Sequence, residues 1–147
     1  MPRYAATIAT SKPVDEVFHY MADFRSVERW DETAVKAELL DGTVPGPEAR
    51  FRVAVKLFGK VSDLDYETVA YEPPRRFVLR AETPSIISED EVCVRETGTG
   101  SELTYDASLS PKGVMKLASP ILGIVFKRLG DNAAKGLARE LGGKIVA

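Results

Sequence analysis

The segment SKPVDEVFHYMADFRSVERWDE, residues 11–32, decides the fold because it places two short helices near the start of the chain. Its first apolar residues recur at i, i+3, i+4 and i+7, the spacing of one helical face: Val14, Val17, Phe18 and Met21. Pro13 suits the first position of this helix, and the acids after it complement the positive end of the helix dipole. Asp23 can begin a second short helix that ends near Trp30.

From residue 33 to residue 110 the periodicity changes from helical to alternating, and the turn residues suit a meander of antiparallel strands. The clearest strand, residues 50–57, alternates apolar and polar side chains, which predicts one apolar and one largely solvated face. Val35, Ala37 and Leu39 alternate in the same way and are predicted to share a face. Further strands are predicted at 61–71, 76–81, 85–96 and 101–110.

After Pro111 the pattern is helical again to about Leu141. Pro120 and Gly123 predict a break or kink in the first third of this helix, because proline removes a helical hydrogen-bond donor. The predicted order is one strand, two short helices, six strands and a long helix. This is an α+β fold, in which the long helix covers the apolar face of an antiparallel sheet of about seven strands.

Composition narrows the possible classes of function. The 147 residues, 44% of them hydrophobic, predict one soluble domain over residues 1–147, and a net charge of -2 gives no general attraction to nucleic acid. One cysteine, Cys93, and one histidine, His19, cannot form an intrachain disulfide or a Cys/His metal site, and no cofactor motif is present. The N-terminus does not read as a secretory signal, so a cytoplasmic location is expected. His19 falls off the apolar helix face, which favours a surface histidine over a general base.

Several short motifs, in this order and spacing, carry a family resemblance: SKPV at 11–14, EVF at 16–18, ERWD at 28–31, YEPPRR at 71–76 and GSELTY at 100–105. With them the chain resembles the START-like (SRPBCC) superfamily, in particular the polyketide cyclase/dehydrase and lipid-transport family. The resemblance implies a helix-grip fold, a curved sheet wrapped around the last helix. It also implies an elongated cavity between sheet and helix that takes up an apolar or aromatic small molecule.

Candidate ligand contacts follow from this cavity and from strand parity. Trp30 is expected either as a wall or lid of the cavity or, with equal weight, as a plug of the core. Asp31 and Glu32 are expected to be solvated or capping acids rather than a catalytic pair. The full set of predicted ligand contacts is Trp30, Phe51, Val53, Tyr66, Phe77, Asp90, Val92, Tyr105, Ala118 and Leu122.

Three polar members of this set are chosen by the two-residue period of strands. Tyr105 lies on the face of Leu103 and Ala107, and Tyr66 on the face of Leu64. Asp90 shares a face with Val92, where desolvation would raise the pKa of its carboxyl group and suit it to proton transfer. The polar run SEDE at 88–91 nevertheless favours a solvated strand end over a buried one.

The segment VMKLASPILGIVF, residues 114–126, carries more apolar side chains than one helical stripe needs. It is too short to span a membrane. Leu117, Ile121 and Ile124 point away from the core-facing stripe, so loops must cover them or they form a portal, a dimer contact or a shallow membrane dock. VPGPE at 44–48 is predicted as the facing lip.

Two functions follow. The first, which the sequence favours, is binding or transport of a lipid, quinone or polyketide-like molecule in the cavity, without a cofactor, by a monomer or homodimer. The second is a polyketide aromatase/cyclase in which cavity Tyr or Asp groups assist enolisation and loss of water. No catalytic residue is assigned. A third possibility is a partner-binding module that uses the Leu117 and Ile124 side.

Overall fold

The computed structural model describes residues 2–41, 46–57 and 59–147, apart from the side chains of residues 118 and 119. The chain forms β1 (Arg3–Thr10), α1 (Val14–Ala22), the 3-10 helix η1 (Phe24–Ser26), α2 (Val27–Trp30), β2 (Ala34–Asp41), β3 (Arg50–Leu57), β4 (Lys60–Glu72), β5 (Arg76–Glu82), β6 (Ile86–Thr97), β7 (Gly100–Pro111), the 3-10 helix η2 (Gly113–Ala118), α3 (Ser119–Glu140) and β8 (Lys144–Ile145). The predicted order of strand, short helices, meander and long helix is confirmed.

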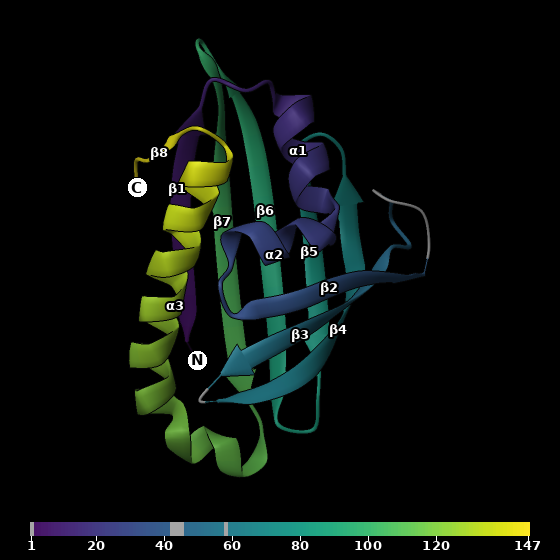
Figure 1. Cartoon of the computed structure of the whole chain (residues 1–147), viewed down its shortest axis with the longest axis vertical. Helices are drawn as coiled ribbons and strands as arrows, with labels where there is room; N and C mark the ends of the chain where they lie inside the picture. The colour runs from purple at the N-terminus through teal and green to yellow at the C-terminus, as the bar shows by residue number, and fades with distance from the viewer. Residues whose placement is uncertain (1, 42–45, 58) are drawn as a thin grey trace.

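One antiparallel sheet contains eight strands in the order β2-β3-β4-β5-β6-β7-β1-β8. It curves around the helices, with α3 against β1, and α1 over β6 and β7 (Figure 1). The helix-grip architecture is therefore confirmed. The strand beyond the predicted seven comes from the end of the chain, where Ile145 and Lys144 pair with Ile8 and Ala9.

The predicted alternation in β2 is wrong at Val35. The register against β3 shifts between Ala34 and Lys36, so the side chain of Val35 turns outward and is 49% exposed. Ala34 is buried in its place, together with Ala37. A β-bulge adds one residue to a strand and so reverses the parity beyond it, which a two-residue period cannot predict.

The predicted break in the C-terminal helix is confirmed. Gly113–Ala118 forms a 3-10 helix, and α3 starts only at Ser119, where the chain bends (Figure 1). Pro120 is the second residue of α3, in the first turn, where a missing N–H costs no helical hydrogen bond. The α-helix is therefore about 33 Å long at the standard rise per residue, shorter than one that runs from Pro111 to Leu141.

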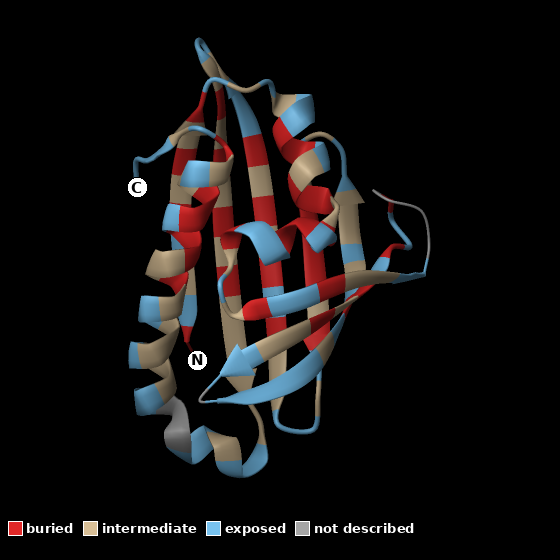
Figure 2. Cartoon of the chain, in the orientation of Figure 1, coloured by how far each residue is buried: buried red, intermediate tan, exposed pale blue. Residues whose placement is uncertain are grey.

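The core lies between the inner face of the sheet and the helices. Figure 2 shows burial concentrated in the middle of the strands and on the sides of α1 and α3 that face them. The helices approach so closely that a Cβ on Gly136 would lie 2.1 Å from the carbonyl oxygen of Trp30. Glycine at this position lets α3 pack directly on α2.

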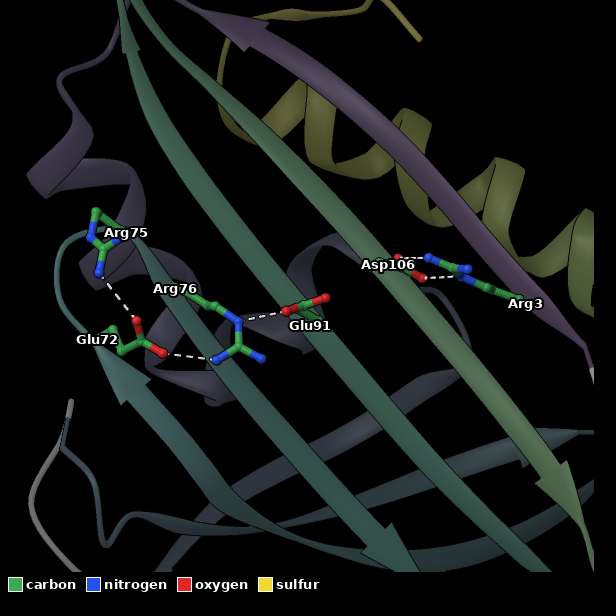
Figure 3. Close-up of polar contacts among 6 residues, drawn as sticks. All are labelled: Arg3, Glu72, Arg75, Arg76, Glu91 and Asp106. Atoms are coloured by element: carbon green, nitrogen blue, oxygen red, sulfur yellow. Dashed lines mark hydrogen bonds and ion pairs between the residues drawn. The ribbon is translucent and has the colours of Figure 1, made fainter.

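The outer face of the sheet is covered by ion pairs. Arg76 bridges Glu72 and Glu91, and Arg3 pairs with Asp106 on the neighbouring strands (Figure 3). Cys93 is half-buried on this outer side of β6, between the inward-facing, buried Val92 and Val94. Cys93 therefore does not face the inner side of the sheet.

Candidate ligand-binding cavity

A cavity of about 130 Å³ lies between the inner faces of β3, β4, β6 and β7, the η1–α2 segment and α3. Most of its lining is apolar. Phe126 and Leu129 line it from α3, and Leu57, Ile86 and Leu109 line it from the ends of strands. These five side chains are only half-buried or exposed, so this end forms the mouth of the cavity.

The opposite end of the cavity carries its polar groups. Tyr66 from β4, Ser88 and Asp90 from β6, and Tyr105 from β7 are all buried and line it. The hydroxyl oxygens of Tyr66 and Ser88 lie 2.8 Å apart and share a hydrogen bond. Because strand side chains alternate, these residues of β4, β6 and β7 reach the inner face while their chain neighbours point outward.

Asp31 adds a second carboxyl group to this end. It follows α2 and lines the cavity while its Oδ1 accepts hydrogen bonds from the backbone N–H of Thr33 at 2.9 Å and from its hydroxyl group at 2.7 Å. The local turn fixes the direction of the carboxyl group. Glu32, the next residue, is exposed and accepts a hydrogen bond from Asn132.

Burial dominates the electrostatics of this end. It raises the pKa of Asp90 from 3.8 to about 7, the charge of Asp31 adds to the rise, and a hydrogen bond from Tyr105 opposes it. Burial also raises the pKa of Asp31, against the hydrogen bonds from Thr33 that lower it. Burial raises the pKa values of Tyr66 and Tyr105 further above their usual value, so both phenols stay protonated near neutral pH.

The site can therefore hold or move a proton at Asp90 near neutral pH. In its protonated form Asp90 donates a hydrogen bond, and in its ionised form it accepts a proton, which is the requirement for general acid–base chemistry. The tyrosines offer hydroxyl groups that donate or accept hydrogen bonds but do not ionise. Within the described ranges, no three His, Cys, Asp or Glu side chains gather closely enough to hold a metal ion.

The favoured prediction that the SEDE run is a solvated strand end is wrong for its inward-facing members. Ser88 and Asp90 are buried, at 8% and 6% exposure, whereas Glu89 is exposed and Glu91 is half-buried. Four consecutive polar residues suggested exposure, but the sheet curves over this part of β6 and encloses one of its faces. The two-residue period was the more reliable guide.

Of the ten predicted ligand contacts, four line the cavity: Val53, Tyr66, Asp90 and Tyr105. Four others are buried in the core without lining it: Trp30, Phe51, Phe77 and Val92. Leu122 is half-buried on α3 and does not line the cavity either, because the start of α3 lies beyond the mouth. The side chain of Ala118 falls outside the part of the chain that the structure describes.

Trp30 fills the core, so the plug interpretation is correct and the lid interpretation is wrong. Its ring contacts that of Tyr105 edge-to-face, with centroids 5.3 Å apart, and lies 6.3 Å from that of Phe24. Its Nε1 donates to the hydroxyl of Ser26 at 3.4 Å. Trp30 thus supports the Tyr105 ring from behind, and Tyr105 meets the cavity.

Sequence reasoning missed Asp31 as a cavity group because Asp31 and Glu32 were treated as one pair. Adjacent residues do point apart here, which leaves one of them free to face inward. The spacing Asp-x-Thr at 31–33 signals a turn that fixes the carboxyl group, and it could have separated the two acids.

The apolar side chains of segment 114–126 that were predicted to point away from the core are uncovered. Leu117, Ile121 and Ile124 are 87%, 65% and 76% exposed, so the interpretation that loops cover this side is wrong. Val44 and Pro45 of the predicted lip lie outside the described residues. The end of β2 and the start of β3 lie across the molecule from η2 (Figure 1).

The fold and cavity define a helix-grip protein of the START class. The chain belongs to the family described as polyketide cyclase / dehydrase and lipid transport, whose model matches residues 1–142. No curated protein sequence matches the chain. In the described part of the chain, no helix is both long and apolar enough to cross a membrane.

Solved structures share the fold at low sequence identity. A START superfamily protein from Mycobacterium smegmatis superposes with a TM-score of 0.78 at 12% identity, covering 95% of this chain and 97% of that chain. The Zhui aromatase/cyclase from Streptomyces gives 0.67 at 14% identity, covering 94% of both chains. The di-domain aromatase/cyclase BexL gives 0.65 at 13% identity, covering 93% of this chain and 46% of that chain.

Proposed function

We propose that this protein binds or carries a hydrophobic small molecule, such as a lipid, quinone or polyketide-like compound, in the cavity between the sheet and α3. The observation that supports the proposal is the distribution of side chains along the cavity. Apolar side chains form the mouth and walls, and hydrogen-bonding groups form the buried end. Such a lining takes up an apolar body and orients it through one polar end. Family membership supports the same function.

The size of the cavity limits what can be enclosed. Its volume of about 130 Å³ is close to that of an engineered apolar cavity of about 150 Å³ that binds benzene. One ring or a short chain therefore fits inside with its polar end near Asp90 and Tyr105. A longer body extends through the mouth between Phe126 and the strand ends.

Native mass spectrometry of the purified protein, followed by denaturing extraction, tests the proposal directly by identifying a co-purified apolar molecule.

A substitution that fills the cavity tests whether the ligand binds there. Ala107→Phe adds a ring inside the cavity and should abolish uptake of phenylbutanol, a neutral probe followed by NMR shifts of cavity residues. Val61→Phe, on an exposed position of β4, is the matched control and should bind normally. Unchanged uptake in a folded Ala107→Phe variant would contradict the cavity as the site.

A second candidate, a cyclase or dehydratase, is favoured by one observation: a buried carboxyl group whose pKa is about 7 lies in the cavity beside Tyr105. Ionised Asp90 would remove a proton from carbon next to a ketone, forming the enolate. Protonated Asp90 would then give that proton to a departing hydroxyl group, so that a C=C bond forms and water leaves. Tyr105 would donate a hydrogen bond to the enolate oxygen.

The enzyme is tested with Asp90→Asn and Tyr105→Phe on a β-hydroxyketone substrate. Both should abolish dehydration while weakening binding of the substrate much less, since each removes only one polar atom. Turnover by both variants at the normal rate would remove these residues from any mechanism and leave the carrier function.

We further propose a cytoplasmic location and a monomeric or homodimeric state. The single cysteine, which cannot form an intrachain disulfide, fits a reducing compartment. Cell fractionation checks the location, and analytical ultracentrifugation checks the oligomeric state.

A further inference from the structure

The charge of the cavity lining narrows the class of ligand. We infer that the cavity selects hydrophobic amines and rejects organic anions, because two carboxyl groups and no cationic side chain line its buried end. Among the described lining residues there is no Lys, Arg or His, whereas Asp31 and Asp90 are both present. This inference rests on the proposed binding function and names the polar end of its ligand.

These two acids differ from the other acids of the fold in their lack of counterions. The ion pairs among the described residues hold acids on the surface, such as Asp65 with Arg52 and Glu91 with Arg76, and none involves Asp31 or Asp90. Asp31 accepts two hydrogen bonds from Thr33, and the phenol of Tyr105 acts on Asp90 as a neutral donor that lowers its pKa. Both carboxyl groups are held by neutral donors.

The groups around Asp90 leave the negative charge uncompensated. Tyr66 and Tyr105 face it from β4 and β7, and Asp31 acts on it from the turn after α2. Glu89, its outward neighbour on β6, adds a further repulsion. The side chains that α3 contributes to the lining are all uncharged: Phe126, Leu129, Gly130 and Ala133.

A bound ammonium group relieves this repulsion. Placed between the two carboxyl groups, it favours their ionised forms, and each carboxylate in turn stabilises the desolvated cation. The aromatic rings of Tyr66 and Tyr105 at the same end add a cation–π attraction. A carboxylate or phosphate at this position meets like charge without water, which disfavours binding strongly.

The experiment compares three probes with the same apolar body: phenylbutylamine, phenylbutanol and phenylbutyrate. NMR titration gives the dissociation constants at about pH 5.5 and about pH 8.5, between which the amine and the carboxylate probes keep their charges. The amine should bind at least about tenfold more tightly at the higher pH, where Asp90 is ionised, while the alcohol changes little. At the higher pH the order should be amine, alcohol, then carboxylate.

Asp90→Asn should remove the pH dependence and bring the amine and the alcohol close together, whereas Glu96→Gln, at an exposed position of the same strand, should behave as the wild type. Phenylbutyrate binding as tightly as phenylbutanol, or an amine no tighter than the alcohol, would overturn the charge selectivity and leave the cavity function standing. If none of the three probes shifts the NMR signals of cavity residues, the proposed binding function of the cavity itself is contradicted.

A second inference comes from exposed apolar side chains on η2 and the start of α3. Val114, Leu117, Ile121 and Ile124, here called the apolar patch, are 83%, 87%, 65% and 76% exposed. Val114 and Leu117 are three residues apart on η2, and Ile121 and Ile124 are three residues apart on α3, so each pair shares one side of its helix. Phe126 and Leu129 of the same helix line the cavity mouth, so the apolar patch lies next to the entrance.

The charges around the apolar patch indicate which kind of partner binds there. Residues 112–128 contain Lys112, Lys116, Lys127 and Arg128 and no acid, a charge of +4 in a chain of net charge -2, which leaves -6 for all other residues. Lys112 and Lys127 form ion pairs with Glu82 and Asp131, but no ion pair in the described part of the chain involves Lys116 or Arg128. We propose that the apolar patch docks on an anionic lipid bilayer, from which an apolar ligand enters the cavity.

A bilayer fits this segment better than a second copy of the chain does. Two apolar patches facing each other would bring Lys116 and Arg128 of both copies together, and this repulsion opposes a dimer. An anionic membrane instead attracts each basic residue near its surface by about 1 kcal/mol and accepts apolar side chains at the headgroup boundary.

Vesicle sedimentation tests the docking with phosphatidylcholine alone and with phosphatidylcholine containing phosphatidylglycerol. The protein should pellet with the anionic vesicles, lose this binding as salt is raised, and bind the neutral vesicles at least about tenfold more weakly. Leu117→Ser with Ile124→Ser should remove the binding, and so should Lys116→Gln with Arg128→Gln. Val61→Ser with Val69→Ser, two exposed valines of β4, is the control and should leave it unchanged.

Equal binding to both kinds of vesicle, or none to either, would overturn membrane docking. Dimerisation in the absence of lipid that Leu117→Asp abolishes would assign the apolar patch to a second copy of the chain instead.

Discussion

Asp90 and Glu91 are adjacent on β6 and carry the same charge, yet the two faces of the sheet give them opposite environments. Glu91 points outward and accepts a hydrogen bond from Arg76 at 2.6 Å, within the chain of ion pairs that also contains Glu72 (Figure 3). Asp90 points inward and is buried, and none of the ion pairs among the described residues involves it. The outer face solvates and pairs its charges, whereas the inner face leaves its acids at the end of an apolar cavity.

The largest change in stability is expected from removing the packing that supports the inner face of the sheet. Trp30→Ala leaves a large cavity behind Tyr105 and should lower the free energy of unfolding by about 3 to 5 kcal/mol. Val69→Ala on the exposed side of β4 should change it much less. Urea denaturation measures both. A loss no greater for Trp30→Ala than for Val69→Ala would mean that the core does not depend on this ring.

The second prediction concerns pH. The pKa of Asp90 is raised from 3.8 in the unfolded chain to about 7 in the folded one, so between these values the folded state binds more protons. The contribution of this group to stability is therefore complete below about pH 4 and is lost as the pH rises through about 7. Over that window the loss is at most about 4 kcal/mol.

Asp90→Asn should remove this dependence of the free energy of unfolding on pH. The stability of the variant should therefore rise relative to that of the wild type as the pH rises from about 5 to about 8. Urea denaturation at several pH values in that range measures the difference. A wild-type curve parallel to that of the variant would show that Asp90 titrates normally, and would also weaken its assignment as an acid–base group.

The smallest effect is expected on the outer face. Glu91→Gln removes one end of an exposed ion pair and should shift the thermal midpoint by no more than about 2 °C, because solvent screens such pairs. The effect should shrink further in high salt. If Glu91→Gln changed the stability as much as Asp90→Asn does, the two faces of the sheet would not be as different as their contacts indicate.

The sequence predicted the order of elements well, because helical and strand periodicities are local. The apolar spacing from Val14 to Met21, the break at Pro120 and the inward direction of Tyr66 and Tyr105 depend only on residues a few positions apart. The errors arose where a local period was interrupted or its environment was unknown. The bulge after Ala34 reversed the parity of Val35, and the polar run at 88–91 concealed a buried acid.

The sequence by itself determined the fold class, the family and, where no bulge interrupts a strand, the side on which a residue lies, since all of these follow from periodicity and from motifs along the chain. Only the tertiary structure decided which inward positions meet the cavity. The curvature of the sheet and the place where α3 passes over it bring Asp31 and Asp90 to one buried end, and they put Trp30 in the core. These contacts join elements far apart in sequence, where no local pattern carries the information.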